Sequence, residues 1–214
     1  MKPEIRRELR DYIEQQIIPC YRTFDRAHNL DHVRAVIDRS LTLAADCEVN
    51  AEMVYTIAAY HDTGLVNGRE HHHLDAGRIL EADPELRRWF PEEEIRTMRE
   101  AVEDHRASSD HAPRSIYGRI VAEADRQIDP ETVLRRTIQY SLAHYPELDR
   151  EGHFARCTEH LRGKYAEGGY LRLWIVPSEN ARRLDELRRI INDAQLLRDR
   201  FDHLFDIEIR TPGL

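Results

Sequence analysis

Apolar residues recur at three- and four-residue intervals along almost the whole chain, which is 214 residues long. This is the period of an α-helix that buries one face. Segment 52–61, Glu-Met-Val-Tyr-Thr-Ile-Ala-Ala-Tyr-His, is apolar nearly all round, so we expect a short helix buried at the centre of the fold. Apart from a weak alternation at Ile207 and Ile209, no segment has the two-residue period of a strand. The pattern therefore predicts an all-α fold, a single-domain bundle of about eight helices over residues 1–214.

Prolines, glycines and capping residues divide this pattern into separate helices. Asn29 is the expected N-cap of the second helix, and Ser178 is expected to begin a long last helix. The loop before Ser178 is unusually apolar at Tyr170–Ile175, which suits a lid over the site, a homodimer contact, or core that covers the bundle. The expected helices cover about 5–17, 30–45, 52–61, 72–82, 91–106, 115–125, 130–145, 149–165 and 178–205.

The charge and the cysteines disfavour several classes of protein. Lys and Arg number 32 and Asp and Glu 40, so the net charge of 32 − 40 = −8 disfavours duplex nucleic acid as the main partner. No run of 18 apolar residues is present to span a membrane, and the charged N-terminus lacks the apolar core of a signal peptide. Three widely spaced cysteines are typical of a reduced protein. We therefore expect a cytoplasmic protein with no membrane partner.

The residues that point to chemistry are histidines and aspartates. His61 and Asp62 end the buried helix, where the chain opens and neighbouring side chains can converge on one point. His32 and Asp125 lie beside stretches that we expect in the core, where a polar group needs a partner. One metal ion shared by His32, His61, Asp62 and Asp125 would satisfy all four. Imidazole nitrogen and carboxylate oxygen without thiolate suit Mn, Fe, Zn, Co or Ni.

The order of these residues on successive helices, a histidine, then His-Asp, then a distant aspartate, resembles the HD superfamily of metal-dependent phosphohydrolases. The resemblance covers about 28–126 and implies that this range is the core that holds the metal site. We expect C-terminal helices over 130–206 to cover this core. It implies that the four metal ligands are His32, His61, Asp62 and Asp125. The tail, in which Ser-Glu-Asn-Ala-Arg-Arg at 178–183 opens a long helix, is similar to the small bacterial single-domain HD hydrolases. This resemblance also implies that a metal-bound water molecule attacks the phosphorus atom of a phosphate group.

The same resemblance assigns roles to further histidines. His72 starts the helix after the His-Asp pair and His105 ends the next one; in relatives such histidines bind a second metal or the substrate phosphate. His71 and His73 compete with His72, because a shift of one residue rotates a side chain by about 100°. We select His72 because it places Ala76-Gly77 at the family's pair of small residues. The other histidines, His28, His111, His144, His153, His160 and His203, are expected to be solvated or to cap helices.

We therefore expect a metal-dependent phosphohydrolase that acts on a nucleotide or another small phosphate ester or anhydride. The cofactor would be Mn, Fe, Co, Ni, Zn or Mg, with a second ion at His72 and His105. Asp62 would hold the attacking water, and His72 or His105 would protonate the leaving oxygen. Guanidinium groups match phosphate geometry, so the substrate-binding candidates are Arg126, Arg34 and Arg78.

Two other functions stay open from the sequence. Many family members carry a lysine or an acidic residue two or three places after the His-Asp pair, whereas this chain continues Thr63-Gly64-Leu65-Val66. This departure leaves the substrate class open. Some members of the superfamily are di-iron oxygenases, which require both extra histidines as ligands. A regulatory nucleotide- or phosphate-binding domain is the third alternative.

Overall fold

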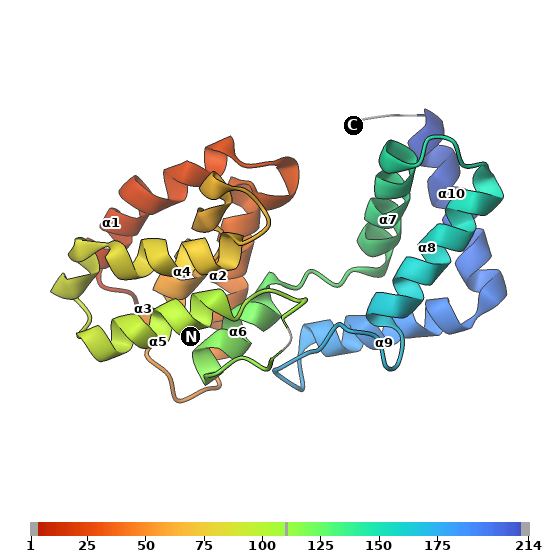
Figure 1. Ribbon diagram of the computed structural model, residues 1–214. Helices are drawn as coiled ribbons and strands as arrows, with labels where there is room; N and C mark the ends of the chain where they lie inside the picture. The colour runs from red at the N-terminus through yellow and green to blue at the C-terminus, as the bar shows by residue number, and fades with distance from the viewer. Residues whose placement is uncertain (1–3, 110, 211–214) are drawn as a thin grey trace. The chain divides into compact units, whose positions relative to one another are not determined.

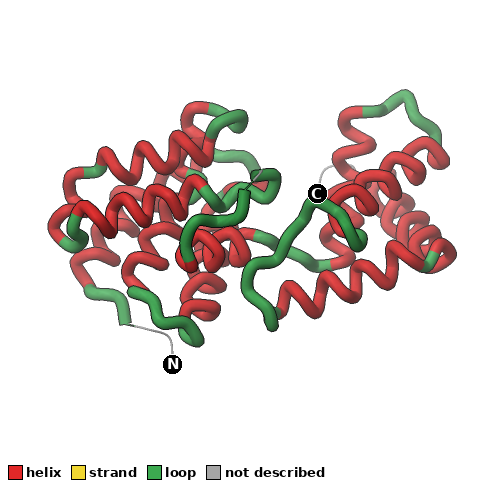
Figure 2. Tube along the Cα trace, turned by 60° about the horizontal axis from the view of Figure 1, so that its bottom comes forward, coloured by secondary structure: helices red, strands yellow, loops and turns green. Residues whose placement is uncertain are grey.

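The computed structural model describes residues 4–109 and 111–210, and its contacts divide the chain into two compact units, 1–126 and 127–214. Over the described residues the chain forms ten α-helices and no strand (Figures 1 and 2). The all-α class is therefore confirmed, with a slightly larger number of helices than expected. The single-domain organisation, with residues 130–206 covering the metal site, stays a prediction.

The first unit is built from six α-helices and several short 3₁₀ segments. Capping side chains begin the helices where the sequence indicates. Asn29 accepts a hydrogen bond from the His32 amide and thereby begins α2, as expected, and Asn50 and Ser115 begin α3 and α6 in the same way. The helices are α1 (Arg7–Tyr12), α2 (Leu30–Ala44), α3 (Ala51–Tyr60), α4 (His72–Ala82), α5 (Glu92–Glu103) and α6 (Ile116–Asp125).

Helix α3 lies at the centre of the first unit. All its residues from Met53 to Tyr60 are buried, and it packs against α2, α5 and α6. This confirms the prediction of a buried central helix. Because α3 is apolar on every side, its C-terminal end lies inside the unit rather than at its surface. Whatever follows Tyr60 must therefore begin in a buried environment.

The second unit contains α7 (Pro130–His144), α8 (Arg150–Tyr165), α9 (Glu179–Asn192) and α10 (Ala194–Arg210). The prediction of one long last helix from 178 to 205 is wrong. Asp193 has extended backbone angles (φ −97°, ψ 102°), and its carboxylate accepts from the amide of Leu196, so one helix ends and another is capped there. The apparent alternation at Ile207 and Ile209 belongs to α10.

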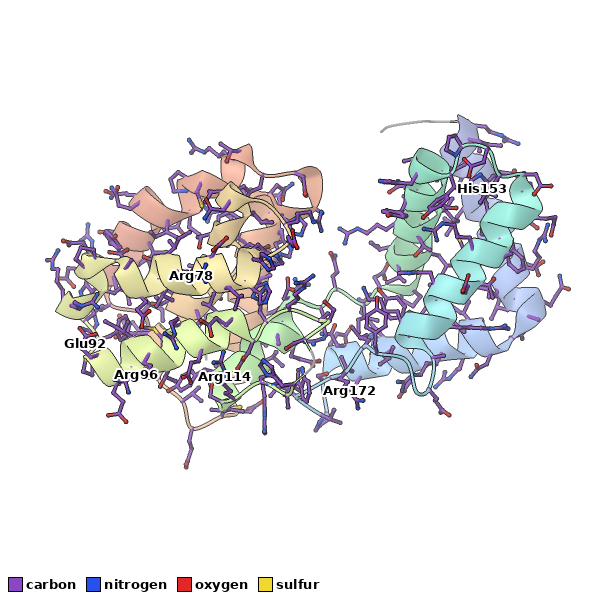
Figure 3. All side chains as sticks on the ribbon, viewed as in Figure 1. Arg78, Glu92, Arg96, Arg114, His153 and Arg172 are labelled. Carbon is purple, nitrogen blue, oxygen red and sulfur yellow. The ribbon has the colours of Figure 1, made fainter. Side chains whose placement is uncertain are left out.

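The second unit also shows the surroundings of His153 and of the apolar loop before α9. His153, expected to be solvated or capping, is 3% exposed, accepts or donates a 2.8 Å hydrogen bond with Ser141 Oγ and packs on the Phe205 ring (Figure 3). In the apolar loop before α9, Leu171 is buried whereas Tyr170 and Val176 are exposed. No helix in the described part of the chain has both the length and the apolar character needed to cross a bilayer.

A glycine two residues after the His-Asp pair determines how closely α4 approaches the 3₁₀ segment Thr63–Asn67, which follows the pair. A Cβ atom on Gly64 would lie 2.0 Å from the carbonyl oxygen of His72 and 2.5 Å from the amide nitrogen of Ala76. Both atoms belong to backbone, which cannot rotate away as a side chain can. The first turn of α4, which carries His72, therefore requires glycine at position 64.

We predict that Gly64→Ala lowers the free energy of unfolding by about 2 kcal/mol or more, because backbone of α4 must move to relieve the clash. Urea denaturation measures the loss. Gly163→Ala is the matched control: Gly163 lies in α8 with nothing within 4 Å of an added Cβ, so alanine is expected to stabilise the helix by about 0.5–1 kcal/mol. Equal effects of the two substitutions would contradict this account of α4.

Candidate metal centre

Four polar side chains meet where α3 ends. His61 follows α3 directly and is fully buried, and Asp62 is 2% exposed. His32 reaches this point from the first turn of α2, and Asp125 from the last residue of α6. Residues that lie up to 93 positions apart in the chain (125 − 32 = 93) thus present their nitrogen and oxygen atoms to one small volume.

The ligand atoms of this group lie within a few ångströms of one another. His32 Nε2 is 3.2 Å from His61 Nε2, 3.5 Å from Asp62 Oδ2 and 3.2 Å from Asp125 Oδ1. His61 Nε2 is 3.1 Å from Asp62 Oδ2 and 3.7 Å from Asp125 Oδ1. Atoms that share one ion at about 2.1 Å lie about 3.0–3.4 Å apart, so this spacing suits a common cation.

The chemistry of the group also fits a metal ion. Asp62 Oδ2 is buried and has no hydrogen-bond partner in the described chain, although a buried carboxylate oxygen without a partner is costly. The Nδ1–H of His61 donates to the carbonyl oxygen of Ala58 at 2.8 Å. Because a carbonyl only accepts, the neutral ring keeps the lone pair of Nε2 for the centre of the group. The residues present therefore suit a divalent cation with nitrogen and oxygen ligands.

A second group shares Asp62 with the first. Asp62 Oδ1 lies 3.6 Å from His72 Nε2 and 3.5 Å from His105 Nε2. The Nδ1–H groups of His72 and His105 donate to the carbonyls of Arg69 and Val102, each three residues earlier, as His61 does with Ala58. The same local geometry thus directs three imidazole Nε2 atoms at one carboxylate.

The structure decides which histidine of the run at 71–73 reaches this carboxylate. His72 does, and its side chain is 16% exposed. The side chain of His71 is 64% exposed and lies beside Glu70. His73 lies next to the rings of the site without joining either group, and burial, with the charges of His105 and Arg106, lowers its pKa to about 4. The choice of His72 from the sequence matches this geometry.

The charges in the two groups shift one another's proton affinity. Burial alone would raise the pKa of Asp62, but the attraction of His61 and the nearby Nε2 atoms of His105 and His32 outweigh burial and lower it. For Asp125, burial is likewise outweighed by the hydrogen bond from His32, so its pKa falls. Burial opposes a charge on His32, yet the carboxylates of Asp125 and Asp62 beside it raise its pKa to about 9. A cation that binds to these groups would therefore displace protons.

The loop after α5 holds His105 in position. Asp104, next to it, is 2% exposed and accepts hydrogen bonds from the backbone amide and the guanidinium of Arg114 at 2.6 and 3.0 Å (Figure 3). A buried carboxylate paired in this way ties the end of α5 to the segment before α6. His105 itself is 2% exposed, and although burial opposes its charge, its bond to Asp62 raises its pKa.

The arginines named from the sequence differ in their surroundings. Arg126 is 6% exposed and donates from one terminal nitrogen to the carbonyl of Ala122. Its Nε is buried and has no hydrogen-bond partner among the residues that the structure describes. Arg34 pairs with Glu14 at 3.0 Å, and Arg78, on α4 (Figure 3), pairs with Asp75 at 2.8 Å. The role of all three in binding substrate stays a prediction, as do the roles of the ligands.

Arg39 was not among the residues expected at the site. Within the described part of the chain, its buried Nε has no hydrogen-bond partner. Burial lowers the pKa of its guanidinium, and the charge of Asp125 opposes this shift. The signal in the sequence was its position, seven residues after His32 and so on the same face of α2.

We predict that the affinity for Mn²⁺ rises with pH by up to about tenfold per unit from pH 7 and levels off above about pH 9, where His32 becomes mostly neutral. The raised pKa means that binding must displace a proton at pH 7. Calorimetric titration over pH 6–10, in buffers of different ionisation enthalpy, measures both the affinity and the protons released. A variant of an exposed histidine, His71→Gln, is the control and is expected to show the same profile. An affinity that does not depend on pH would contradict the role of His32.

Comparison with known proteins agrees with this geometry. Residues 29–127 match the family model described as the HD domain, a range that begins at the N-cap of α2 and ends just after Asp125. No curated protein and no solved structure matches the chain. HD domains hold divalent metal ions, as the two histidine and aspartate groups of this chain are suited to do. The match to the HD domain thus covers residues 29–127, the part of the chain that contains both groups.

Proposed function

We propose that this protein is a metal-dependent phosphohydrolase that cleaves a nucleotide or another small phosphate ester or anhydride. The observation that supports it best is the meeting of His32, His61, Asp62 and Asp125 at 3.1–3.7 Å, where the buried Asp62 Oδ2 has no hydrogen-bond partner among residues 4–109 and 111–210. The match to the HD domain adds the reaction class. A divalent ion held there would lower the pKa of a water molecule towards about 7 and polarise a phosphoryl oxygen.

Asp62 is the central residue of the proposed mechanism. One oxygen faces His32 and His61, and the other faces His72 and His105. An ionised carboxylate only accepts hydrogen bonds, so it can hold and orient the attacking water by one of the water's protons. The lowered pKa of Asp62 keeps this carboxylate ionised at neutral pH, which the role requires.

Two histidines are the candidates for the proton that the leaving group needs. The Nδ1–H of His105 is engaged by Val102, so any further proton resides on Nε2, the atom that faces Asp62. Its raised pKa favours that protonated form. His105 can therefore donate from Nε2 to the leaving oxygen. Burial lowers the pKa of His72, which favours its neutral form and a role as a ligand of a second ion.

The proposed substrate class rests on the arginines near the site. Arg126 directly follows Asp125, and its unpartnered Nε is free to donate to a phosphate oxygen. Arg34 and Arg78 would first have to leave Glu14 and Asp75. We propose a small phosphorylated compound of the nucleotide class as the partner, since guanidinium groups recognise its phosphates bidentately.

A di-iron oxygenase is the second candidate. The observation in its favour is the second group, in which Asp62 Oδ1 faces His72 and His105 so that one carboxylate would bridge two ions. An oxygenase needs two iron ions and consumes dioxygen, whereas the proposed hydrolase needs neither. The number and identity of bound metals, together with oxygen uptake, separate the two functions.

The direct test is elemental analysis of protein purified without a nickel column, combined with a phosphate-release screen over nucleotides and simple phosphate esters. Release of phosphate or pyrophosphate that depends on added Mn²⁺, Co²⁺, Ni²⁺ or Mg²⁺ supports the proposal. Nucleotide binding without turnover under all these ions would instead indicate a regulatory domain. Two irons with oxygen uptake would indicate the oxygenase.

Asp62→Ala is expected to abolish metal binding and to reduce hydrolysis by about a thousandfold or more, because both groups lose the carboxylate that they share. Elemental analysis and the phosphate-release assay measure the two losses. Asp46→Ala, which removes an exposed carboxylate outside the site, is the control and should change neither. A metal content of Asp62→Ala equal to that of the unaltered protein would refute the assigned site.

His105→Ala is expected to lower turnover by about a hundredfold while one metal ion stays bound, because His32, His61, Asp62 and Asp125 remain in place. Steady-state kinetics and metal counting are the measurements. His71→Ala removes an exposed histidine from the same neighbourhood and should leave turnover unchanged. Full activity of His105→Ala would make it a structural residue.

A further inference from the structure

Side chains donate hydrogen bonds to the last carbonyl groups of α3. The last carbonyl groups of a helix have no amide partner within it. Here Ala58 accepts from His61 Nδ1 at 2.8 Å, Ala59 from Tyr21 Oη at 2.9 Å and Tyr60 from Thr63 Oγ1 at 2.7 Å. Two of these donors lie within three residues of the helix end. Tyr21 comes from a different part of the chain, 38 residues before the carbonyl that it contacts.

The same phenol oxygen also accepts a hydrogen bond from the backbone amide of Asp62, at 3.2 Å. In a continued helix this amide would donate to the carbonyl of Ala58, four residues earlier, but His61 Nδ1 already occupies that carbonyl. Asp62 has left the helical conformation, with φ −107° and ψ 4°. Tyr21 therefore gives a partner to the amide of the residue at which α3 breaks.

Tyr21 is well placed to hold a fixed geometry. It is fully buried, and its ring lies 6.2 Å from the ring of His61 and 5.2 Å from that of Phe24. It belongs to a 3₁₀ segment, Ile18–Thr23, whose Ile18 is also buried. This segment precedes residues 29–127, the range that matches the HD domain. A part of the chain outside that range thus contacts the two ends of the His61-Asp62 turn.

We propose that Tyr21 is a positioning residue for Asp62: by bridging Ala59 O and Asp62 N with one hydroxyl group, it sets the turn that directs the Asp62 carboxylate towards both histidine groups. The inference rests on the proposed metal centre. Its physical basis is that a carboxylate which must present each oxygen to a different group tolerates little rotation of its backbone.

The test compares two buried tyrosines by removing only a hydroxyl group from each. Tyr21→Phe removes the bridge, whereas Tyr55→Phe removes a buried hydroxyl that has no hydrogen-bond partner in the described chain. Both rings and their packing remain. Mn²⁺ affinity is measured by titration, and Co²⁺ is bound to each variant so that its visible absorption spectrum reports the ligand geometry.

Tyr21→Phe is expected to bind Mn²⁺ about tenfold more weakly and to alter the Co²⁺ spectrum, while Tyr55→Phe matches the unaltered protein in both. Affinity within twofold of the unaltered protein and an unchanged Co²⁺ spectrum would overturn the inference. That conclusion holds even if the melting temperature of Tyr21→Phe falls, because a merely structural role would lower stability without changing the metal geometry.

A second variant covers the case in which Tyr21→Phe does not fold. Replacing Tyr21 by a ring-fluorinated tyrosine keeps the ring and the hydroxyl but makes the oxygen a weaker acceptor for the Asp62 amide. A smaller weakening of Mn²⁺ binding in the same direction supports the inference, and none overturns it. If the unaltered protein itself binds no Mn²⁺ or Co²⁺, the proposed metal centre fails, which is distinct from the failure of Tyr21 alone.

Discussion

The structure of the first unit depends on one buried carboxylate. Asp62 presents one oxygen to His32 and His61 and the other to His72 and His105, at the point where the central helix α3 ends. A buried charge is stable only if it is paired or coordinates an ion. Helices α2 and α4 and the end of α5 each bring an imidazole group to this carboxylate, and the segment Ile18–Thr23 brings a hydroxyl group that accepts from the Asp62 amide. The same side chains therefore contribute both to the packing of the helices and to the chemistry of the site.

Because a misplaced buried carboxylate is costly, the residues near Asp62 have little conformational freedom. Gly64 must lack a side chain because the first turn of α4 lies against it. Three histidines engage carbonyls three residues earlier, which removes the freedom of each ring to turn its Nε2 elsewhere. Such preorganisation lowers the entropy lost when an ion binds, and it keeps like groups close together in the absence of one.

Much of the site could be predicted because its residues lie at positions that periodicity identifies. The apolar run at 52–61 indicates a buried helix, so a His-Asp pair at its end must lie inside the protein. His32 and Asp125 likewise lie at the start and the end of amphipathic helices. Asn29 was predicted as an N-cap because a cap is a local interaction between residues three apart. Local spacing alone did not reveal that α9 and α10 are separate, because Asp193 both ends one helix and caps the next.

The amino-acid pattern alone was sufficient for the helical class and the central helix, since both depend on contacts between near neighbours in the chain. The tertiary fold was needed to select His72 over its neighbours, to bury His153 beside Ser141, and to bring Tyr21 to the amide of Asp62. These outcomes depend on how segments far apart in the chain approach each other, and a difference of one residue in a helix rotates a side chain by about 100°. No local pattern carries that information.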